Sequence, residues 1–113
     1  DAALVDDLVG DDEAPSRRVQ RRAAGIALAV SEAAASVLID AETAHRRGRS
    51  GVAADAKTGA YLADAAVRAS LETVRINAAA LPDRSFAADL ESRARAVEES
   101  VSDARTRLFG GDG

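Results

Sequence analysis

The chain has 113 residues, a length typical of one domain, and about a quarter of them are Ala, which favours helix. It has no cysteine and a single histidine, His45, so disulfides, thiolate metal sites and multi-histidine metal sites within one chain are excluded. The net charge is −4, and six acidic residues among the first thirteen account for it, since the remainder is nearly neutral. We therefore expect no metal and no nucleic-acid partner.

The sequence also predicts the location and partners of the protein. No unbroken apolar run is long enough to span a bilayer and no export signal is present, so we expect no membrane partner and a cytoplasmic location. The only aromatic residues are Tyr61, Phe86 and Phe109, so a lone subunit would have a thin core. We expect further burial against missing chain or against another subunit, in a homodimer or a higher homo-oligomer.

Hydrophobic spacing predicts a short helix over 2–9 and a long helix over 17–47. On the long helix, apolar residues recur at alternating steps of four and three, which predicts one buried face comprising Val19, Ala23, Ile26, Val30, Ala33, Val37, Ala41 and Ala44. Additional apolar side chains predict that the middle of this helix is covered on several sides; they are Leu28, Ala35, Leu38 and Ile39. Gly48 suits the C-terminal end of the helix.

A third helix is predicted over 50–81 and an outer helix over 83–109. The third helix has one apolar stripe, formed by Ala60, Val67, Leu71, Val74, Ala78 and Leu81. A second stripe consists mainly of small residues, which allow close approach of a neighbouring helix; its members are Val52, Gly59, Ala63, Ala66 and Ser70. The outer helix has one apolar seam, formed by Ala87, Leu90, Ala94, Val97, Val101, Ala104 and Leu108. These patterns predict an all-α bundle of long antiparallel helices, forming a single helical domain over 1–113 or the C-terminal part of one.

Three residues of the third helix are candidates for chemistry, although no P-loop, nucleophile elbow or HExxH motif is present. Asp55 lies among Ala residues, where desolvation would raise its pKa toward general acid–base use; alternatively, it suits the helix dipole near an N-terminus. Arg75 is a candidate for gripping a carboxylate and Asn77 for reading an amide edge, or they are a surface Arg and a residue near the helix end. Because 22 residues separate Asp55 from Asn77, the two lie on one face but about 33 Å apart, so only an antiparallel neighbour would bring them together.

A basic patch near the start of the long helix comprises Arg17, Arg18, Arg21 and Arg22. We interpret it as a solvated face that offsets the acidic N-terminal segment. A polyglutamate or phosphate partner is the alternative, and nucleic acid is less favoured because no aromatic residue is interleaved for stacking. His45 is interpreted as a solvated residue near a helix end.

The stretch GRSGVAADAKTGAYLADAAVRASLETVRINAAALPD, from Gly48 to Asp83, resembles the C-terminal part of the cyclodeaminase/cyclohydrolase family, which includes the folate domain of formiminotransferase-cyclodeaminase. The resemblance covers roughly residues 1–109 and is densest at Gly48, Asp55-Ala56, Val74-Arg75-Ile76-Asn77, Leu81 and Asp83. The chain departs from the family at Arg49 and Thr73, where Asn is usual or common. It also contains no segment of the Pro-Gly-Gly-Gly type that such proteins carry near their N-terminus.

The resemblance implies an enzyme of one-carbon folate metabolism that binds a folate-type small molecule between helices of a homodimer or larger symmetric assembly. A tetrahydrofolate derivative would be the substrate, no cofactor would be needed, and the enzyme would be a cyclodeaminase lyase or a methenyltetrahydrofolate cyclohydrolase. Asp55 would be the catalytic carboxylate, and Arg75 and Asn77 would bind substrate. The alternative is a non-catalytic helical oligomerisation or scaffold module, which Arg49 and the missing glycine segment favour.

Overall fold

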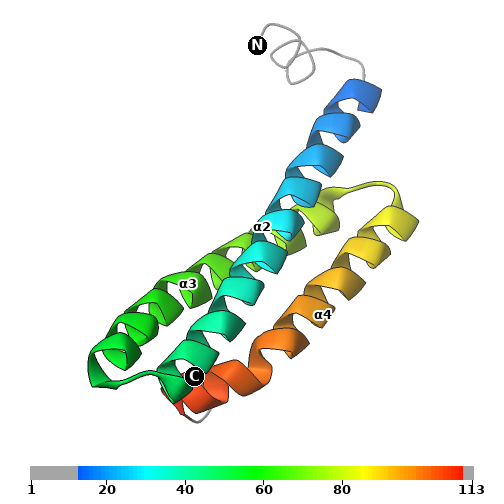
Figure 1. The fold of residues 1–113 in the computed structure, drawn as a ribbon. Coiled ribbons are helices and arrows are strands. Elements are labelled where there is room, and N and C mark those ends of the chain that lie inside the picture. The colour runs from blue at the N-terminus through cyan, green and yellow to red at the C-terminus, as the bar shows by residue number, and fades with distance from the viewer. Residues whose placement is uncertain (1–12, 111–113) are drawn as a thin grey trace, which may run out of the picture.

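The computed structural model describes residues 13–110, which form three helices and no strand. Helix α2 spans Glu13–Arg47, α3 spans Ser50–Ala80 and α4 spans Arg84–Phe109. Figure 1 shows the helices side by side, with the chain reversing direction at each of the two short connections. The all-α class is thus confirmed for the described residues, whereas the helix predicted over 2–9 lies outside them.

A tight connection joins α2 to α3. A Cβ atom at Gly48 would lie only 2.6 Å from the carbonyl oxygen of Ala44, so this position requires glycine because of close backbone approach. The Nδ1–H of His45 donates to the carbonyl oxygen of Ala53 over 2.9 Å, so His45 links the two helices rather than standing free in solvent. Arg49 occupies the N-cap of α3 and makes no side-chain cap hydrogen bond, unlike an Asn, which can accept one.

The second connection is held by charged side chains. Asp83 is the N-cap of α4, and its carboxylate accepts a hydrogen bond of 3.0 Å from the amide of Phe86. Arg21 of α2 pairs with Asp83 at 3.3 Å and lies over the Phe86 ring, 5.4 Å from its centroid. Part of the predicted basic patch therefore anchors α2 to the start of α4.

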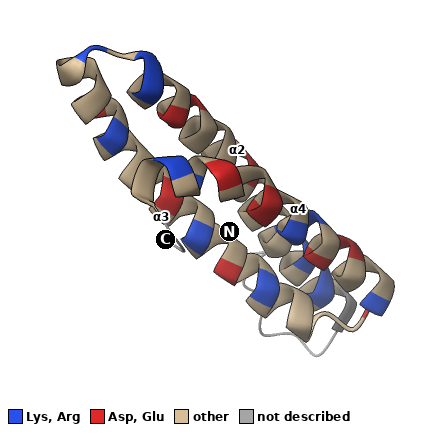
Figure 2. Cartoon of the chain, turned by 90° about the horizontal axis from the view of Figure 1, so that it is seen from below, with Lys and Arg blue, Asp and Glu red and all other residues tan. Residues whose placement is uncertain are grey.

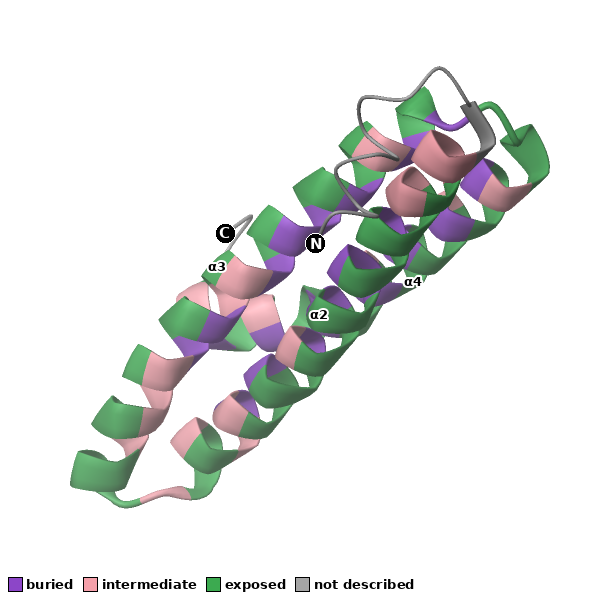
Figure 3. Cartoon of the chain, turned by 90° about the horizontal axis from the view of Figure 1, so that it is seen from above, coloured by how far each residue is buried: buried purple, intermediate pink, exposed green. Residues whose placement is uncertain are grey.

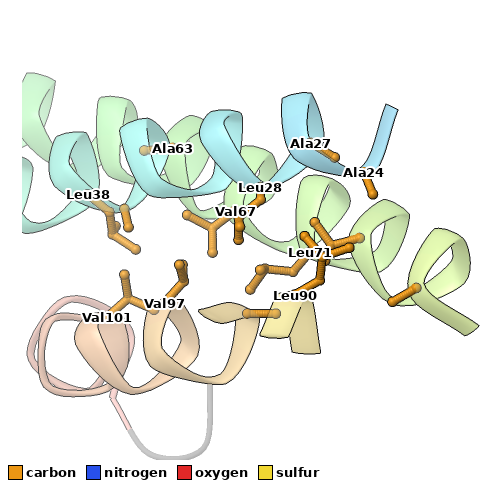
Figure 4. Close-up of a cluster of buried hydrophobic side chains, with 14 of the residues drawn as sticks. Ala24, Ala27, Leu28, Leu38, Ala63, Val67, Leu71, Leu90, Val97 and Val101 are labelled. Atoms are coloured by element: carbon orange, nitrogen blue, oxygen red, sulfur yellow. The ribbon is translucent and has the colours of Figure 1, made fainter. Parts of the chain in front are cut away.

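The core lies where the three helices meet and is built of Ala, Val and Leu side chains (Figure 4). Every member of the predicted α4 seam is buried, and so is every member of the predicted apolar stripe of α3. The small residues of α3 include Ala63 and Ser70, which are buried, and Gly59 and Ala66, which are partly exposed. The predicted apolar stripe thus faces neighbouring helices, as expected from its spacing. The small-residue stripe does so only in part, since Val52 is 57% exposed.

The predicted buried face of α2 is wrong for this chain. Ile26, Val30 and Val37 of that face are 59%, 47% and 55% exposed. The side of α2 that packs on α3 and α4 instead carries Ala24, Ala27, Leu28, Ser31, Ala35, Leu38 and Glu42. The reason is that α2 has two apolar sides, and a periodic pattern alone does not say which of them the same chain covers. Figure 3 shows the uncovered sides of α2 and α3 in green.

Helix α2 is also long and apolar enough, by length and composition, to cross a membrane. An 18-residue window within Pro15–Arg47 has a mean hydropathy of 1.6, and 33% of that window is buried. The expectation of no membrane partner rested on the lack of an apolar run long enough to span a bilayer, and it stays a prediction. A helix with this composition is equally typical of a soluble bundle in which neighbours cover it on more than one side.

Candidate functional site

Asp55 lies in the second turn of α3, on the exposed surface of the helix. No hydrogen bond or ion pair joins its carboxylate to another residue of the range 13–110. Helix α3 continues without a break from Asp55 to Asn77, so the two residues stay at opposite ends of one helix. Within one subunit the structure does not bring them together.

Arg75 and Asn77 point to different sides of α3, because two residues on a helix are separated by a rotation of about 200°. The Arg75 guanidinium reaches toward α4, where its Nη2 lies 3.5 Å from Oε1 of Glu98. The Asn77 side chain donates to the carbonyl oxygen of Thr73 over 2.9 Å, on the side away from α4. These two candidates therefore do not form one local binding pair.

Arg75 opens onto a groove between α3 and α4. The groove has a volume of about 240 Å³ and is lined by Arg75, Glu91 and Arg95. Glu91 pairs with Arg84 at 3.7 Å, whereas Arg95 makes no ion pair with another described residue. Two guanidinium groups at one groove suit an anionic group such as a carboxylate. Arg95 was not identified from the sequence, because its place beside Arg75 depends on how α4 packs on α3.

A network of charged side chains crosses from α3 to α4 beyond this groove. Arg105 of α4 bonds to Asp64 of α3 through Nε at 2.6 Å and to Glu98 through Nη1. Arg68 approaches the second oxygen of Asp64 at 2.9 Å, and Arg75 approaches Glu98. Arg105 and Asp64 are only 12% and 14% exposed, so the centre of the network is largely enclosed between the two helices. The sequence gives no direct signal for it, since Asp64 and Arg105 are 41 positions apart.

The network keeps both carboxylates ionised. Burial would raise the pKa of Asp64, but hydrogen bonds and attraction from Arg68 and Arg105 outweigh it and hold the pKa below its ordinary value. Burial would likewise raise the pKa of Glu98, but hydrogen bonds and attraction from Arg105 and Arg75 outweigh it and hold that pKa below its ordinary value. Groups with lowered pKa values are poor general acids at neutral pH, so we interpret this network as a structural link between α3 and α4.

Replacing Arg105 with Met should destabilise the protein by about 1–3 kcal/mol at pH 7, because two ionised carboxylates lose charge-assisted hydrogen bonds. The lowered pKa values of Asp64 and Glu98 stabilise the fold above the pKa values of the unfolded chain, and this stabilisation is lost as pH falls through the folded-state values. The difference between wild type and variant should therefore shrink on acidification. Urea denaturation at pH 7 and below pH 4 measures it, with Arg95→Met as the matched control; equal loss in both variants would contradict the assignment.

A second groove lies between α2 and α4 and has a volume of about 270 Å³; it is lined by Glu32, Ala35, Ser36, Arg93, Ala96, Val97 and Ser100. Arg93 and Glu32 pair across it at 3.4 Å. Neither groove reaches the volume of about 300–1,000 Å³ that is typical of small-molecule sites. Residues 13–110 also contain no group of three or more His, Cys, Asp or Glu side chains arranged to hold a metal ion.

A family model described as formiminotransferase-cyclodeaminase matches residues 11–96 of the chain. The chain belongs to the formiminotransferase-cyclodeaminase family. No curated protein and no solved structure matches it. Membership links the chain to one-carbon folate chemistry and confirms the resemblance on which the sequence interpretation rested.

The matched range of the formiminotransferase-cyclodeaminase family contains all three candidate site residues as well as Arg95. It covers α2 and α3 completely, together with the first half of α4. The roles of Asp55, Arg75 and Asn77 remain predictions. What the structure adds is their placement: Arg75 faces α4, whereas Asp55 and Asn77 face away from it, at the two ends of α3.

Proposed function

We propose that this chain is part of an enzyme of one-carbon folate metabolism that acts as a formimidoyltetrahydrofolate cyclodeaminase or as a methenyltetrahydrofolate cyclohydrolase. The observation that carries the proposal is the family match over residues 11–96, which includes the candidate residues Asp55, Arg75 and Asn77. A tetrahydrofolate derivative is the substrate, and the reaction needs no metal or further cofactor.

Both reactions take place at one electrophilic carbon. In the cyclodeaminase reaction, N10 of the folate attacks the carbon of the protonated formimino group on N5, the proton of N10 moves to the departing nitrogen, and ammonia leaves to give the methenyl cation. In the cyclohydrolase reaction, water attacks the methenyl carbon and loses one proton; the bond from that carbon to N5 then breaks as the remaining hydroxyl proton moves to N5 and the formyl C=O forms on N10. A carboxylate beside the carbon would stabilise the cation and relay the proton, and Asp55 is our candidate for that role.

The groove at Arg75 and Arg95 supports a complementary role in binding. Folates end in glutamate carboxylates, and guanidinium groups bind carboxylates through two parallel hydrogen bonds. Arg75 is 47% exposed and held only by a contact of 3.5 Å to Glu98, so it is accessible to a ligand. Arg95 would supply the second guanidinium from the facing helix. We therefore assign the carboxylate end of the substrate to this groove.

An absorbance assay tests the proposal. The intact protein is supplied with 5-formimino-tetrahydrofolate in one cuvette and with 5,10-methenyl-tetrahydrofolate in another, and the methenyl chromophore is followed. Growth of the chromophore in the first identifies a cyclodeaminase, and accelerated decay in the second identifies a cyclohydrolase. A folded protein that changes neither signal would exclude both activities and favour a non-catalytic helical scaffold.

A further inference from the structure

The guanidinium group of Arg105 has one nitrogen that makes no hydrogen bond. Its Nε bonds to Asp64 and its Nη1 bonds to Glu98, whereas Nη2 is buried and has no partner among residues 13–110. A buried donor without an acceptor costs the fold free energy. A carboxylate fits a guanidinium best when both of its oxygens accept parallel hydrogen bonds, yet each of these carboxylates offers Arg105 a single oxygen. The second oxygen of either one would suit Nη2.

An arginine of α3 holds each of those second oxygens. Oδ2 of Asp64 lies 2.9 Å from Nε of Arg68, which is an ordinary hydrogen-bond distance. Oε1 of Glu98 lies 3.5 Å from Nη2 of Arg75, which is longer than an ordinary hydrogen bond. The contact between Arg75 and Glu98 is therefore the weaker of the two. Glu98 is the carboxylate that can turn its second oxygen to Arg105.

Arg75 is shared between Glu98 and the groove that it lines with Arg95. A ligand carboxylate that binds Arg75 therefore competes with Glu98. Without another partner, Glu98 would remain beside the ligand as a half-enclosed charge, 36% exposed, and would repel it. Figure 2 shows basic and acidic residues interspersed along the helices, and Arg105 is the basic residue on the far side of Glu98 from the groove. The free Nη2 of Arg105 removes the penalty.

We propose that Glu98 is a positioning residue with two alternative partners, and that a ligand carboxylate exchanges one for the other. In the free protein Glu98 holds Arg75 beside the groove. When the carboxylate end of the folate binds Arg75, Glu98 releases it and accepts hydrogen bonds from both Nη1 and Nη2 of Arg105. No proton moves, and every charged group has a partner before and after the exchange. The proposal rests on the proposed function, which supplies the carboxylate ligand of the groove.

The exchange makes the groove selective for an anionic ligand. An amide oxygen is a weaker acceptor than a carboxylate, so an uncharged ligand cannot replace Glu98 at Arg75. A carboxylate replaces it and then contacts two guanidinium groups, those of Arg75 and Arg95, from facing helices. The remaining acidic residue of the groove, Glu91, pairs with Arg84 at 3.7 Å and so does not take the place of the ligand.

Isothermal titration calorimetry of the intact protein with p-aminobenzoylglutamate, the carboxylate end of folates, tests the exchange without any turnover. Wild type should bind this acid at least about tenfold more tightly than its uncharged diamide. Glu98→Gln removes the competing charge and should tighten binding about threefold. Arg105→Lys keeps the positive charge but cannot donate two parallel hydrogen bonds to Glu98, so binding should weaken at least about fivefold.

The double variant separates exchange from simple attraction between charges. In the Glu98→Gln background, Arg105→Lys should change binding less than about twofold, because no carboxylate then needs a second partner. Arg107→Lys is the matched control: Arg107 is also on α4 and also pairs with a carboxylate, that of Glu42, and its replacement should leave binding within about twofold of wild type. An equal effect of Arg105→Lys in both backgrounds, or a wild type that does not prefer the acid, overturns the proposal.

Nuclear magnetic resonance of protein labelled with ¹⁵N-arginine observes the second partner directly. On saturation of wild type with p-aminobenzoylglutamate, the Nη2 hydrogens of Arg105 gain an acceptor, so their signals should shift downfield and exchange more slowly with water. Glu98→Gln should abolish this change. Unchanged Arg105 signals in saturated wild type overturn the exchange. Folate turnover with unchanged signals would refute the exchange alone, whereas shifted signals without turnover would support the exchange and refute the enzymatic activity.

Discussion

Replacing Asp55 with Ala should lower folate turnover by on the order of 10²–10⁴-fold while the helical circular dichroism signal stays unchanged. The carboxylate is exposed and makes no hydrogen bond or ion pair with another residue of the range 13–110, so its removal costs the fold little. The expected loss is therefore specific to turnover. The absorbance assay, run under single-turnover conditions with each variant at the same concentration, measures it.

Asp103→Ala is the control for this substitution. Asp103 is an exposed carboxylate of α4, on a different helix from Asp55. Its removal changes the net charge by the same amount and should leave turnover within a factor of about two, as expected for a surface substitution remote from chemistry. If Asp55→Ala also kept full turnover, Asp55 would not be the catalytic carboxylate.

Mixing variants separates a site shared between two subunits of the expected homodimer from a site within one subunit. Asp55→Ala and Asn77→Ala proteins each carry the same defect in both sites of a dimer. In an equal mixture, half of the dimers are mixed, and each mixed dimer has one intact site and one doubly substituted site. Turnover should recover to about a quarter of wild type. Recovery no greater than the mean of the two separate variants would place Asp55 and Asn77 in independent sites, even if the dimer itself were confirmed.

The helices that bury one face were predictable from the sequence. In α4 every apolar residue of the predicted seam is buried, because the remaining faces carry Glu, Arg, Asp and Ser and leave no alternative. In α3 the stripe from Ala60 to Leu81 is also buried, although Leu62 and Ile76 place further apolar side chains on an exposed side. In α4 a single period of apolar residues thus identifies a single buried face.

The prediction for α2 failed where the sequence offers two answers. Ile26 and Val30 belong to one regularly spaced apolar side of α2, and Leu28 and Leu38 belong to another. Only Leu28 and Leu38 pack against α3 and α4. Spacing measures how regular a face is, not what covers it.

The candidate site shows a similar division. Spacing along a continuous helix already separated Asp55 from Asn77, and the structure retains that separation. The contacts of Arg75 with Glu98 and its position beside Arg95 depend on the packing of α4 on α3, at a sequence distance of 23 positions for the Glu98 contact. No local pattern encodes such a pairing, so the groove was accessible only from the fold.

Replacing Leu71 with Ala should destabilise the protein by about 2–5 kcal/mol, because it removes three carbon atoms from the middle of a thin core and leaves a cavity. Leu71 is fully buried, and Figure 4 shows it near Leu90 of α4 and Ala24 of α2, where all three helices meet. Much of the surrounding core is Ala, so few large side chains are near enough to move into the cavity and fill it. Against a total stability of about 5–15 kcal/mol, this is a large loss, measurable by urea denaturation followed by circular dichroism.

Leu62→Ala is the matched control, because it makes the same chemical change on α3 at a side chain that is 71% exposed. It should cost no more than about 0.5 kcal/mol, as for other surface substitutions. An equal, large cost for both variants would contradict the position of the core.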